Sequence, residues 1–210
     1  MRSPAVVLLA AGASRRLGTA KALVRLRDEH PASPLELLLS ASRCVDEHPL
    51  VVAGEDAGRI RSALAGDPRV ELLEHPLWHQ GRAGSVRAAA RARPGRDLLI
   101  APVDVPLVPA AVFEALARRW RDEGAPPRGW LAPRVLDQRG ELRHGHPVLL
   151  GRALCSELED TPADLPLREL RSDANPLLAV DVEAIEILDD LDTPADLERL
   201  RTRLRRRDRP

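Results

Sequence analysis

Short apolar runs alternate with amphipathic stretches over the first 120 residues of the chain. Such runs, when bounded by glycine, proline or acidic turns, are typical of buried strands. They predict four strands, at 6–9, 50–53, 70–73 and 97–101. The segments between and after them carry apolar residues at helical spacing, which predicts helices at 34–48, 55–64, 85–93 and 109–120. This alternation indicates a parallel sheet with right-handed crossovers.

The pattern changes in the second half of the chain. Apolar stretches at 130–136 and 147–150 are joined through a polar turn, which predicts an antiparallel pair of strands. Beyond them we expect a short helix at 151–158, short strands at 177–181 and 185–188, and a final helix, capped at Thr193, that ends in an arginine-rich tail at about 201–210. No repeat or linker divides the chain. We therefore expect one α/β domain over residues 1–210, with a mostly parallel sheet and a small antiparallel addition.

The most informative segment is Val6–Lys21, in which the first strand ends in a loop. Side chains as small as those at 10–13 allow a ligand to approach backbone N–H groups. Ser14, Arg16 and Lys21 then offer hydroxyl and cationic partners for phosphate. Lys21 is the only lysine in a chain with 32 lysine and arginine residues in total. A single compact ammonium among so many guanidinium groups indicates that Lys21 binds a nucleotide phosphate. The alternative is that one lysine was kept by chance on a solvated loop.

Two well-known phosphate-binding loops do not fit this segment. A Walker A loop has its lysine directly after a glycine and before serine or threonine, whereas Lys21 stands three residues past Gly18. The dinucleotide-binding pattern G-x-G-x-x-G also fails, because Ala13 and Ser14 follow Gly12. Neither an ATPase of the Walker type nor a dinucleotide-binding fold is supported by motif.

Composition narrows the range of partners. The formal net charge is zero and the aromatic residues are three Trp, one Phe and no Tyr, which disfavours nucleic acid as a partner. Acidic residues interrupt the arginine-rich tail, which we interpret as a solvated helix end. Cys44 and Cys155 lack metal-type spacing and are expected to be reduced and buried. No segment resembles a membrane span or a signal peptide, so we expect a cytoplasmic protein without membrane partners.

The opening segment also matches a more specific pattern. Leu9-Ala10-Ala11-Gly12-x-Ser14-x-Arg16-Leu17-Gly18-x-x-Lys21 resembles the nucleotide-binding signature of the MobA-like nucleotidyltransferases, which include the molybdenum-cofactor nucleotidyltransferases. The family usually has methionine where Leu17 stands and proline where Ala20 stands. The resemblance implies a Rossmann-like three-layer α/β sandwich.

Four further motifs of this family follow in order. His75-Pro76-x-Trp78-x-x-Gly81-x-x-x-Ser85 resembles the stretch near the nucleotide base, although the family often has asparagine in place of His75. Pro102-Val103-Asp104-Val105-Pro106-Leu107 resembles the D-x-P-L strand end, whose aspartate holds Mg²⁺. Gly145-His146-Pro147 resembles the G-H-P segment beside the acceptor. Asp190-Leu191-Asp192-Thr193-Pro194-x-Asp196-Leu197 resembles the motif near the family's C-terminus, which implies Asp190 as the second carboxylate near the metal.

One segment departs from the family pattern. The family often carries G-D-x-G-A-R before its last strands, and the best match here is Ala163-Asp164-Leu165-Pro166-Leu167-Arg168. The spacing of aspartate and arginine is kept, but both glycines are absent. This leaves the local loop geometry and the acceptor pocket open.

The resemblance implies a Mg²⁺-dependent transfer of a nucleoside monophosphate from a nucleoside triphosphate to a phosphate-bearing acceptor, with release of pyrophosphate. Arg16 and Lys21 would hold the triphosphate and, with Asp104, carry catalysis, while Asp104 and Asp190 would hold the metal. The nucleotide site would comprise Leu9, Ala10, Ala11, Gly12, Ser14, Arg16, Lys21 and Ser85, and the acceptor site Gly145, His146 and Pro147. Arg82 or Arg87, which flank Ser85, could also face phosphate.

The same resemblance bears on the substrates. In the family, Leu-Ala-Ala-Gly is associated with members that use CTP and Leu-Ala-Gly-Gly with members that use GTP. Ala11 therefore favours CTP, with molybdopterin as the acceptor and a molybdoenzyme maturation partner. The alternatives are a GTP-using guanylyltransferase, a sugar-phosphate or phospholactate acceptor, and a non-catalytic nucleotide-binding module.

The residues themselves agree with a metal site at Asp104. This aspartate follows a predicted parallel strand, and open α/β sheets bind ligands at the carboxyl ends of their strands. Prolines on both sides would fix its carboxylate, although a turn-forming aspartate fits the same position. Mg²⁺ takes one or two carboxylates and completes its shell with phosphate and water. The second carboxylate is left open among Asp189, Asp190 and Asp192, the last of which also fits a helix start.

Overall fold

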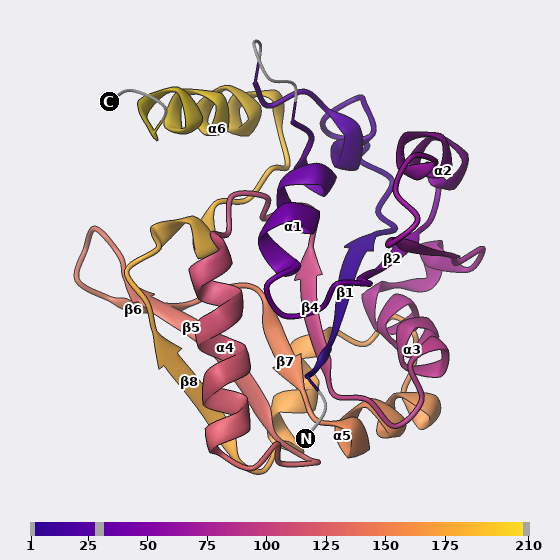
Figure 1. Ribbon diagram of the computed structural model, residues 1–210, viewed down its shortest axis with the longest axis vertical. Coiled ribbons are helices and arrows are strands. Elements are labelled where there is room, and N and C mark those ends of the chain that lie inside the picture. Colours follow the sequence, from indigo (N-terminus) through magenta and orange to yellow (C-terminus); the bar gives the residue numbers. More distant parts are fainter. Residues whose placement is uncertain (1–2, 28–31, 208–210) are drawn as a thin grey trace.

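Strand β1 (Ala5–Ala10) lies in the interior of the sheet, between β2 and β4, and all its residues are buried. In the computed structural model, which describes residues 3–27 and 32–207, the sheet has eight strands in the order β3-β2-β1-β4-β7-β5-β6, and β8 pairs with β5 (Figure 1). The remaining strands are β2 (Leu50–Ala53), β3 (Glu71–Glu74), β4 (Leu98–Pro102), β5 (Trp130–Leu136), β6 (Leu142–His144), β7 (Val148–Leu150) and β8 (Leu177–Asp181).

All strands except β6 and β7 run in the same direction, because β1 to β4 pair in parallel, β7 is antiparallel to both β4 and β5, and β8 is parallel to β5. The predicted mostly parallel sheet with a small antiparallel addition is therefore confirmed. The antiparallel part is larger than expected, since β5 pairs with β6 as well as with β7.

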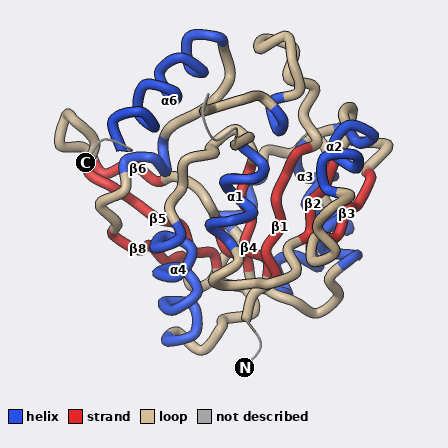
Figure 2. The backbone as a smooth tube through the Cα atoms, turned by 45° about the horizontal axis from the view of Figure 1, so that its top comes forward, coloured by secondary structure: helices blue, strands red, loops and turns tan. Residues whose placement is uncertain are grey.

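Helices cover both faces of the sheet (Figures 1 and 2). Successive side chains of β1 point to opposite faces of the sheet, and an apolar core lies on each face. Val6 and Leu8 pack in the core that includes α1 and α4, while Val7 and Leu9 pack in the core that includes α3 and α5. The helices are α1 (Pro34–Ser42), α2 (Ala57–Leu64), α3 (Arg82–Ala92), α4 (Ala110–Asp122), α5 (Arg152–Glu157) and α6 (Pro194–Arg207), with 3-10 turns η1 (Lys21–Leu23), η2 (Trp78–Gln80), η3 (Leu158–Asp160), η4 (Leu167–Ser172) and η5 (Ile185–Leu188). This is the three-layer Rossmann-like sandwich that the family resemblance implies.

Helix α6 stands apart from the sheet and closes a third apolar cluster above its carboxyl edge (Figure 1). Leu200 and Leu204 of α6 are buried there with Leu17 and Leu26 from the segment after β1. The predicted cap is present, since Thr193 and Asp196 exchange hydrogen bonds at the start of α6. Residues 208–210 of the predicted arginine-rich tail lie outside the described residues.

Three sequence predictions need correction. Residues 185–188, predicted as a strand, form η5, because the chain turns there to bury Ile187 in the core while Glu186 faces Arg203 of α6 at 3.9 Å. Helix α3 begins at Arg82 rather than at residue 85, directly after Gly81. Cys44 is exposed rather than buried, because α1 ends before it, whereas Cys155 is buried and both thiols are free.

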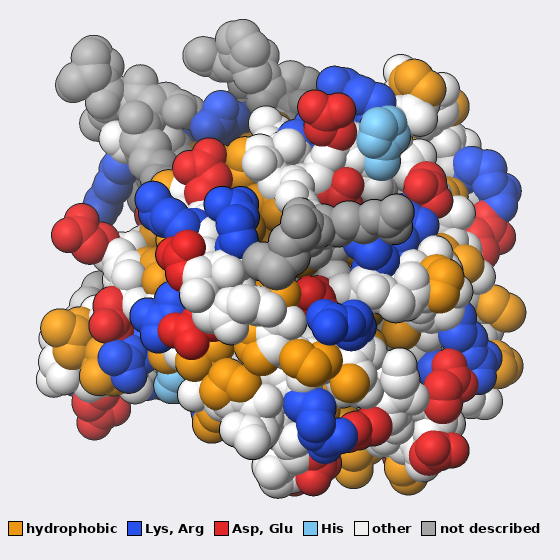
Figure 3. Space-filling model, turned by 60° about the horizontal axis from the view of Figure 1, so that its bottom comes forward, with side chains coloured by type: hydrophobic (Ala, Val, Ile, Leu, Met, Phe, Trp, Pro, Cys, Tyr) orange, Lys and Arg blue, Asp and Glu red, His pale blue; other side chains and the backbone are white. Residues whose placement is uncertain are grey.

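Acidic and basic side chains intermingle over the face shown in Figure 3, as expected for a chain without net charge. No helix among the described residues combines the length and the apolar character needed to cross a bilayer.

Candidate functional site

Ser14 organises the loop between β1 and η1. It has a φ of 49°, and its carbonyl oxygen accepts hydrogen bonds at 3.1 Å from the backbone N–H groups of Leu17 and Gly18. Its hydroxyl oxygen accepts a 3.0 Å hydrogen bond from the N–H of Lys21. Gly18 has a φ of 73°, which glycine adopts without the strain of a Cβ. Ser14 thus closes the loop on itself and fixes the start of η1, from which the Lys21 side chain extends.

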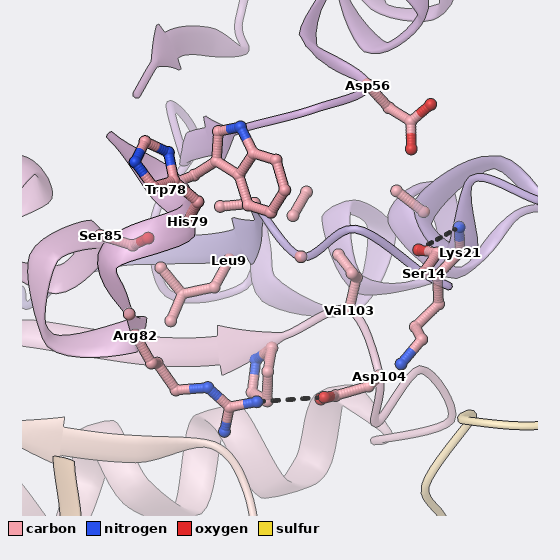
Figure 4. A pocket seen from close by; sticks show the side chains of 16 residues that line it. Leu9, Ser14, Lys21, Asp56, Trp78, His79, Arg82, Ser85, Val103 and Asp104 are labelled. Carbon is pink, nitrogen blue, oxygen red and sulfur yellow. Dashed lines mark hydrogen bonds and ion pairs between the residues drawn. The ribbon is translucent and has the colours of Figure 1, made fainter. Parts of the chain in front are cut away.

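A pocket lies at the carboxyl ends of β1, β2 and β4 (Figure 4). A Cβ added at Gly54, directly after β2, would lie 2.3 Å from the carbonyl oxygen of Ala11 and 2.6 Å from Cγ of Trp78, so a glycine is needed where these walls meet. All the residues predicted to bind nucleotide line the pocket, with the exception of Arg16. The lining consists of Leu9, Ala10, Ala11, Gly12, Ser14, Lys21, Ala22, Asp56, Trp78, His79, Gly81, Arg82, Ser85, Pro102, Val103 and Asp104.

Lys21 and Arg16 share one carboxylate. Nζ of Lys21 lies 2.7 Å from Oδ1 of Asp192, and the guanidinium of Arg16 lies 2.8 Å from its Oδ2. The hydrogen bond from Lys21 lowers the pKa of Asp192, and the charges of Lys21 and Arg16 lower it further against the opposing effect of burial. The Lys21 side chain is only 13% exposed, whereas that of Arg16 is 71% exposed. The two predicted phosphate ligands therefore lie together, with Lys21 inside the pocket and Arg16 at its margin.

Asp104 is fixed between the sheet and the segment before α6. The N–H of Val103, the residue before Asp104, donates to the carbonyl oxygen of Leu9 at 3.1 Å. The pairing of β4 with β1 therefore continues up to the residue before Asp104. The carbonyl oxygen of Asp104 accepts a 2.7 Å hydrogen bond from the N–H of Leu191. Its carboxylate lies 3.2 Å from the guanidinium of Arg82, the first residue of α3 (Figure 4).

The three aspartates that the sequence leaves as alternatives lie in different surroundings. Asp189 is 5% exposed and is bound by two arginines of α6, at 2.8 and 3.0 Å. Asp192 binds Lys21. Burial raises the pKa of Asp190, and the neighbouring carboxylates of Asp104 and Asp192 raise it further. Asp190 is thus a candidate to share a cation with Asp104, whereas Asp189 is held by arginines of α6.

The chemistry of Asp104 and Asp190 fits a divalent cation. A cation between these carboxylates would relieve the repulsion that contributes to the raised pKa of Asp190. Within residues 3–27 and 32–207, no three His, Cys, Asp or Glu side chains form a metal-binding group. A metal that completes its shell with phosphate oxygens and water, as Mg²⁺ commonly does, needs no third protein ligand.

His146 lies beside Asp104, on the side of the antiparallel strands. Burial and the positive charge of Arg82 lower the pKa of His146 to about 4, against the opposing charge of Asp104. Its backbone N–H donates to a carbonyl oxygen of η5 at 3.2 Å, and a Cβ added at Gly145 would lie 2.4 Å from that oxygen. Nδ1 is buried without a hydrogen-bond partner among the described residues. Gly145, His146 and the buried Pro147 thus border the site at Asp104, outside the lining of the pocket.

The segment 163–168, which departs from the family pattern, packs on the beginning of α3. The carbonyl oxygen of Ala163 accepts a 3.3 Å hydrogen bond from the N–H of Gly84. A Cβ added at Gly81, whose φ is 135°, would lie 2.3 Å from the same oxygen. Arg168 is exposed and pairs with the neighbouring Glu169, so it does not line the pocket. This segment supports the helix start that presents Arg82.

Sequence reasoning assigned no role to Asp56 or His79, and it mentioned Trp78 only within a motif and Arg82 only as an alternative. Asp56 follows β2 at the carboxyl edge of the sheet. Because open α/β sheets bind ligands at that edge, the argument that predicted a role for Asp104 applies to Asp56 as well. Trp78 and His79 meet edge to face, with ring centroids 6.0 Å apart. Figure 4 shows Asp56 and Arg82 on opposite sides of the pocket.

The fold of this chain has counterparts among solved structures. The crystal structure of Rv0371c from Mycobacterium tuberculosis H37Rv superposes with a TM-score of 0.73 at 28% identity, covering 95% of this chain and 99% of that one. A second structure of that protein, in complex with manganese, gives a TM-score of 0.68 at 25% identity over 95% and 98%. Molybdopterin-guanine dinucleotide biosynthesis protein A from Archaeoglobus fulgidus shares the fold, with a TM-score of 0.70 at 20% identity over 96% and 98%.

The bifunctional protein GlmU of Sphingopyxis alaskensis is 34% identical over 133 residues, which are 60% of this chain and only 28% of that protein's length. The family model of the MobA-like NTP transferase domain matches residues 6–178, from the first residues of β1 into β8. That span contains the loop of Lys21, the pocket lining and Asp104. The chain therefore belongs to the MobA-like NTP transferase family of nucleotidyltransferases.

Proposed function

We propose that this protein is a Mg²⁺-dependent enzyme that transfers a nucleoside monophosphate from CTP to molybdopterin and releases pyrophosphate. The observation that carries the proposal is the convergence of Lys21, Asp104 and the small-residue loop 10–12 on one pocket at the carboxyl edge of the sheet. The choice of CTP rests on Ala11, which gives the Leu-Ala-Ala-Gly sequence of the CTP-using members of the family.

The bond changes define what the site must do. An acceptor phosphate oxygen attacks the α-phosphorus of the nucleotide, a new P–O bond forms, and the bond to the β-phosphate bridging oxygen breaks so that pyrophosphate leaves. A phosphate monoester is mostly dianionic at neutral pH, so the attacking oxygen has no proton to lose. Catalysis therefore consists of positioning and charge stabilisation rather than of general-base chemistry.

Each side chain has a distinct task in this scheme. Lys21, held by the loop around Ser14, neutralises charge on the triphosphate from inside the pocket, and Arg16 does so from its margin. Asp104 and Asp190 hold the divalent cation, which supplies positive charge at the reacting phosphate when bound. His146 stays neutral near pH 7, so it borders the acceptor without adding charge.

A pyrophosphate-release assay tests the proposal. Purified protein with Mg²⁺ is offered CTP or GTP, each with molybdenum-bound molybdopterin, a sugar phosphate or phospholactate. We expect release that depends on both CTP and molybdopterin, and that is lost in Asp104→Asn. A preference for GTP would overturn the assignment of the nucleotide, and turnover with a different acceptor would overturn that of molybdopterin. Nucleotide binding without any turnover would instead identify a binding module.

A further inference from the structure

Five charged side chains in and beside the pocket form ion pairs with one another. Lys21 and Arg16, from the segment after β1, bind Asp192, which precedes α6. Arg82, which begins α3, binds Asp104, which follows β4. With Asp190 counted, three cationic and three acidic side chains meet here from four separate parts of the chain. These six side chains carry no net formal charge between them, and Asp56, which also lines the pocket, pairs with Arg59.

This pairing conflicts with the way in which the proposed substrates would bind. A triphosphate would require Lys21 and Arg16, whose partner is now Asp192. A divalent cation would require Asp104, whose partner is now Arg82. Either ligand by itself must break an ion pair and leave one charged side chain without a partner in a crowded site.

We infer that Asp192 and Arg82 are internal substitutes for the triphosphate and for the divalent cation, so that the metal and the nucleotide bind together by exchange of ion pairs. When both enter, Arg82 leaves Asp104 and meets phosphate, while Asp192 leaves Lys21 and faces the incoming cation. Each displaced group then finds a new partner. This inference rests on the proposed function, and it assigns Arg82 as a phosphate contact and Asp192 as a group that faces the cation in the loaded site.

The exposure of the two pairs is compatible with such an exchange. The Arg82 side chain is 49% exposed and that of Asp192 is 34% exposed, so each can swing into solvent. The side chains of Lys21 and Asp104, which stay in place, are more buried than those of Arg82 and Asp192. Their backbones are held by hydrogen bonds, Lys21 to the hydroxyl of Ser14 and Asp104 to the N–H of Leu191. Ion pairs of such exposure are individually weak, so their exchange does not block binding.

The first test measures Mn²⁺ binding to the nucleotide-free protein from the EPR signal of free Mn²⁺. In Arg82→Gln, Asp104 loses its internal partner, and we expect Mn²⁺ to bind about threefold to tenfold more tightly than in the wild type. Arg91→Gln is the matched control, because Arg91 is on the same helix but pairs with Glu159 outside the pocket. Arg82→Lys keeps the charge and should stay near the wild-type affinity. Equal Mn²⁺ affinity in Arg82→Gln and Arg91→Gln would overturn the inference.

The second test titrates CTP, and GTP in parallel, by calorimetry with EDTA and then with Mn²⁺. Asp192→Asn should bind the metal-free nucleotide about threefold to tenfold more tightly, and the gain in affinity caused by Mn²⁺ should shrink by a similar factor. Glu198→Gln, which removes an exposed carboxylate of α6, is the control. Equal affinity of Asp192→Asn and Glu198→Gln for the metal-free nucleotide would overturn the inference, because removal of Asp192 would then have released nothing that the triphosphate uses.

Failure of the inference and failure of the proposed function give different results. Wild-type protein that binds Mn²⁺ with CTP and turns over, but whose Arg82 and Asp192 variants match their controls, contradicts only the exchange of ion pairs. Wild-type protein that binds neither CTP nor GTP with Mn²⁺ contradicts both. Circular dichroism spectra that match the wild type show that the variants are folded.

Discussion

Removal of the Lys21 charge tests the centre of the proposed mechanism. In Lys21→Met the apolar stem remains but the ammonium is lost, and the backbone N–H still donates to Ser14, so the loop keeps its anchor. A hydrogen bond to a charged group is worth about 1.5–3 kcal/mol, and the 13% exposure of Lys21 places it at the upper end of that range. About 3 kcal/mol corresponds to a loss of about 150-fold in kcat/KM.

Arg16 provides an internal comparison. It binds the same carboxylate as Lys21 but is 71% exposed, so water screens its charge and the loss in Arg16→Met should stay below about tenfold. Steady-state pyrophosphate release at varied CTP gives kcat/KM for both variants, with Arg15→Met as an exposed control in the same loop. A variant Lys21→Met that keeps more than a third of wild-type kcat/KM, or that loses less than Arg16→Met, would refute the reasoning.

Three further predictions concern the stability of the fold. Gly145→Ala would place a Cβ 2.4 Å from the carbonyl oxygen of Ile187, so we expect a loss of about 1–3 kcal/mol in urea unfolding and reduced turnover, and an unchanged midpoint would contradict the tight contact. Trp120→Phe removes the buried indole N–H, which donates to Oδ2 of Asp97 at 3.0 Å, and should lower the free energy of unfolding by about 1–3 kcal/mol in the same assay. Leu142→Ala, at an exposed position, is the control and should leave it nearly unchanged. Although burial raises the pKa of Asp196, hydrogen bonds from Arg199 and Thr193 outweigh it and lower that pKa to about 2 from an ordinary 3.8. The lowered pKa means that its carboxylate stabilises the fold at neutral pH and that this contribution, about 1–2 kcal/mol after allowance for partial exposure, is lost as the pH falls from about 4 to about 2. Asp196→Asn should flatten that part of the stability–pH curve, and an unchanged slope would argue against the hydrogen bonds.

Local rules of the chain determined most of the elements. Strand β1 is apolar on both of its faces, so neither face suits contact with solvent. It therefore lies in the interior of the sheet, where helices cover both faces. Ser33 and Glu36 form the complete capping box that their spacing predicts at the start of α1. Asp104 could be placed at the carboxyl edge because parallel strands end at a common edge.

Tertiary contacts decided what local rules could not. The apolar residues 185–188 fit a strand equally well, and they form η5 because Ile187 must enter the core while the chain turns toward α6. The exposure of Cys44 likewise depends on where α1 ends.

The partition of charge in the site is also a tertiary result. By sequence, Asp189, Asp190 and Asp192 are nearly equivalent, because they stand within four residues and carry the same group. The fold distinguishes them by giving Asp189 to arginines of α6, Asp192 to Lys21 and Asp190 to the neighbourhood of Asp104. The sequence by itself therefore determined which residue types reach this edge of the sheet. Only the structure decided which cation faces which carboxylate, because those pairs join residues up to 176 positions apart.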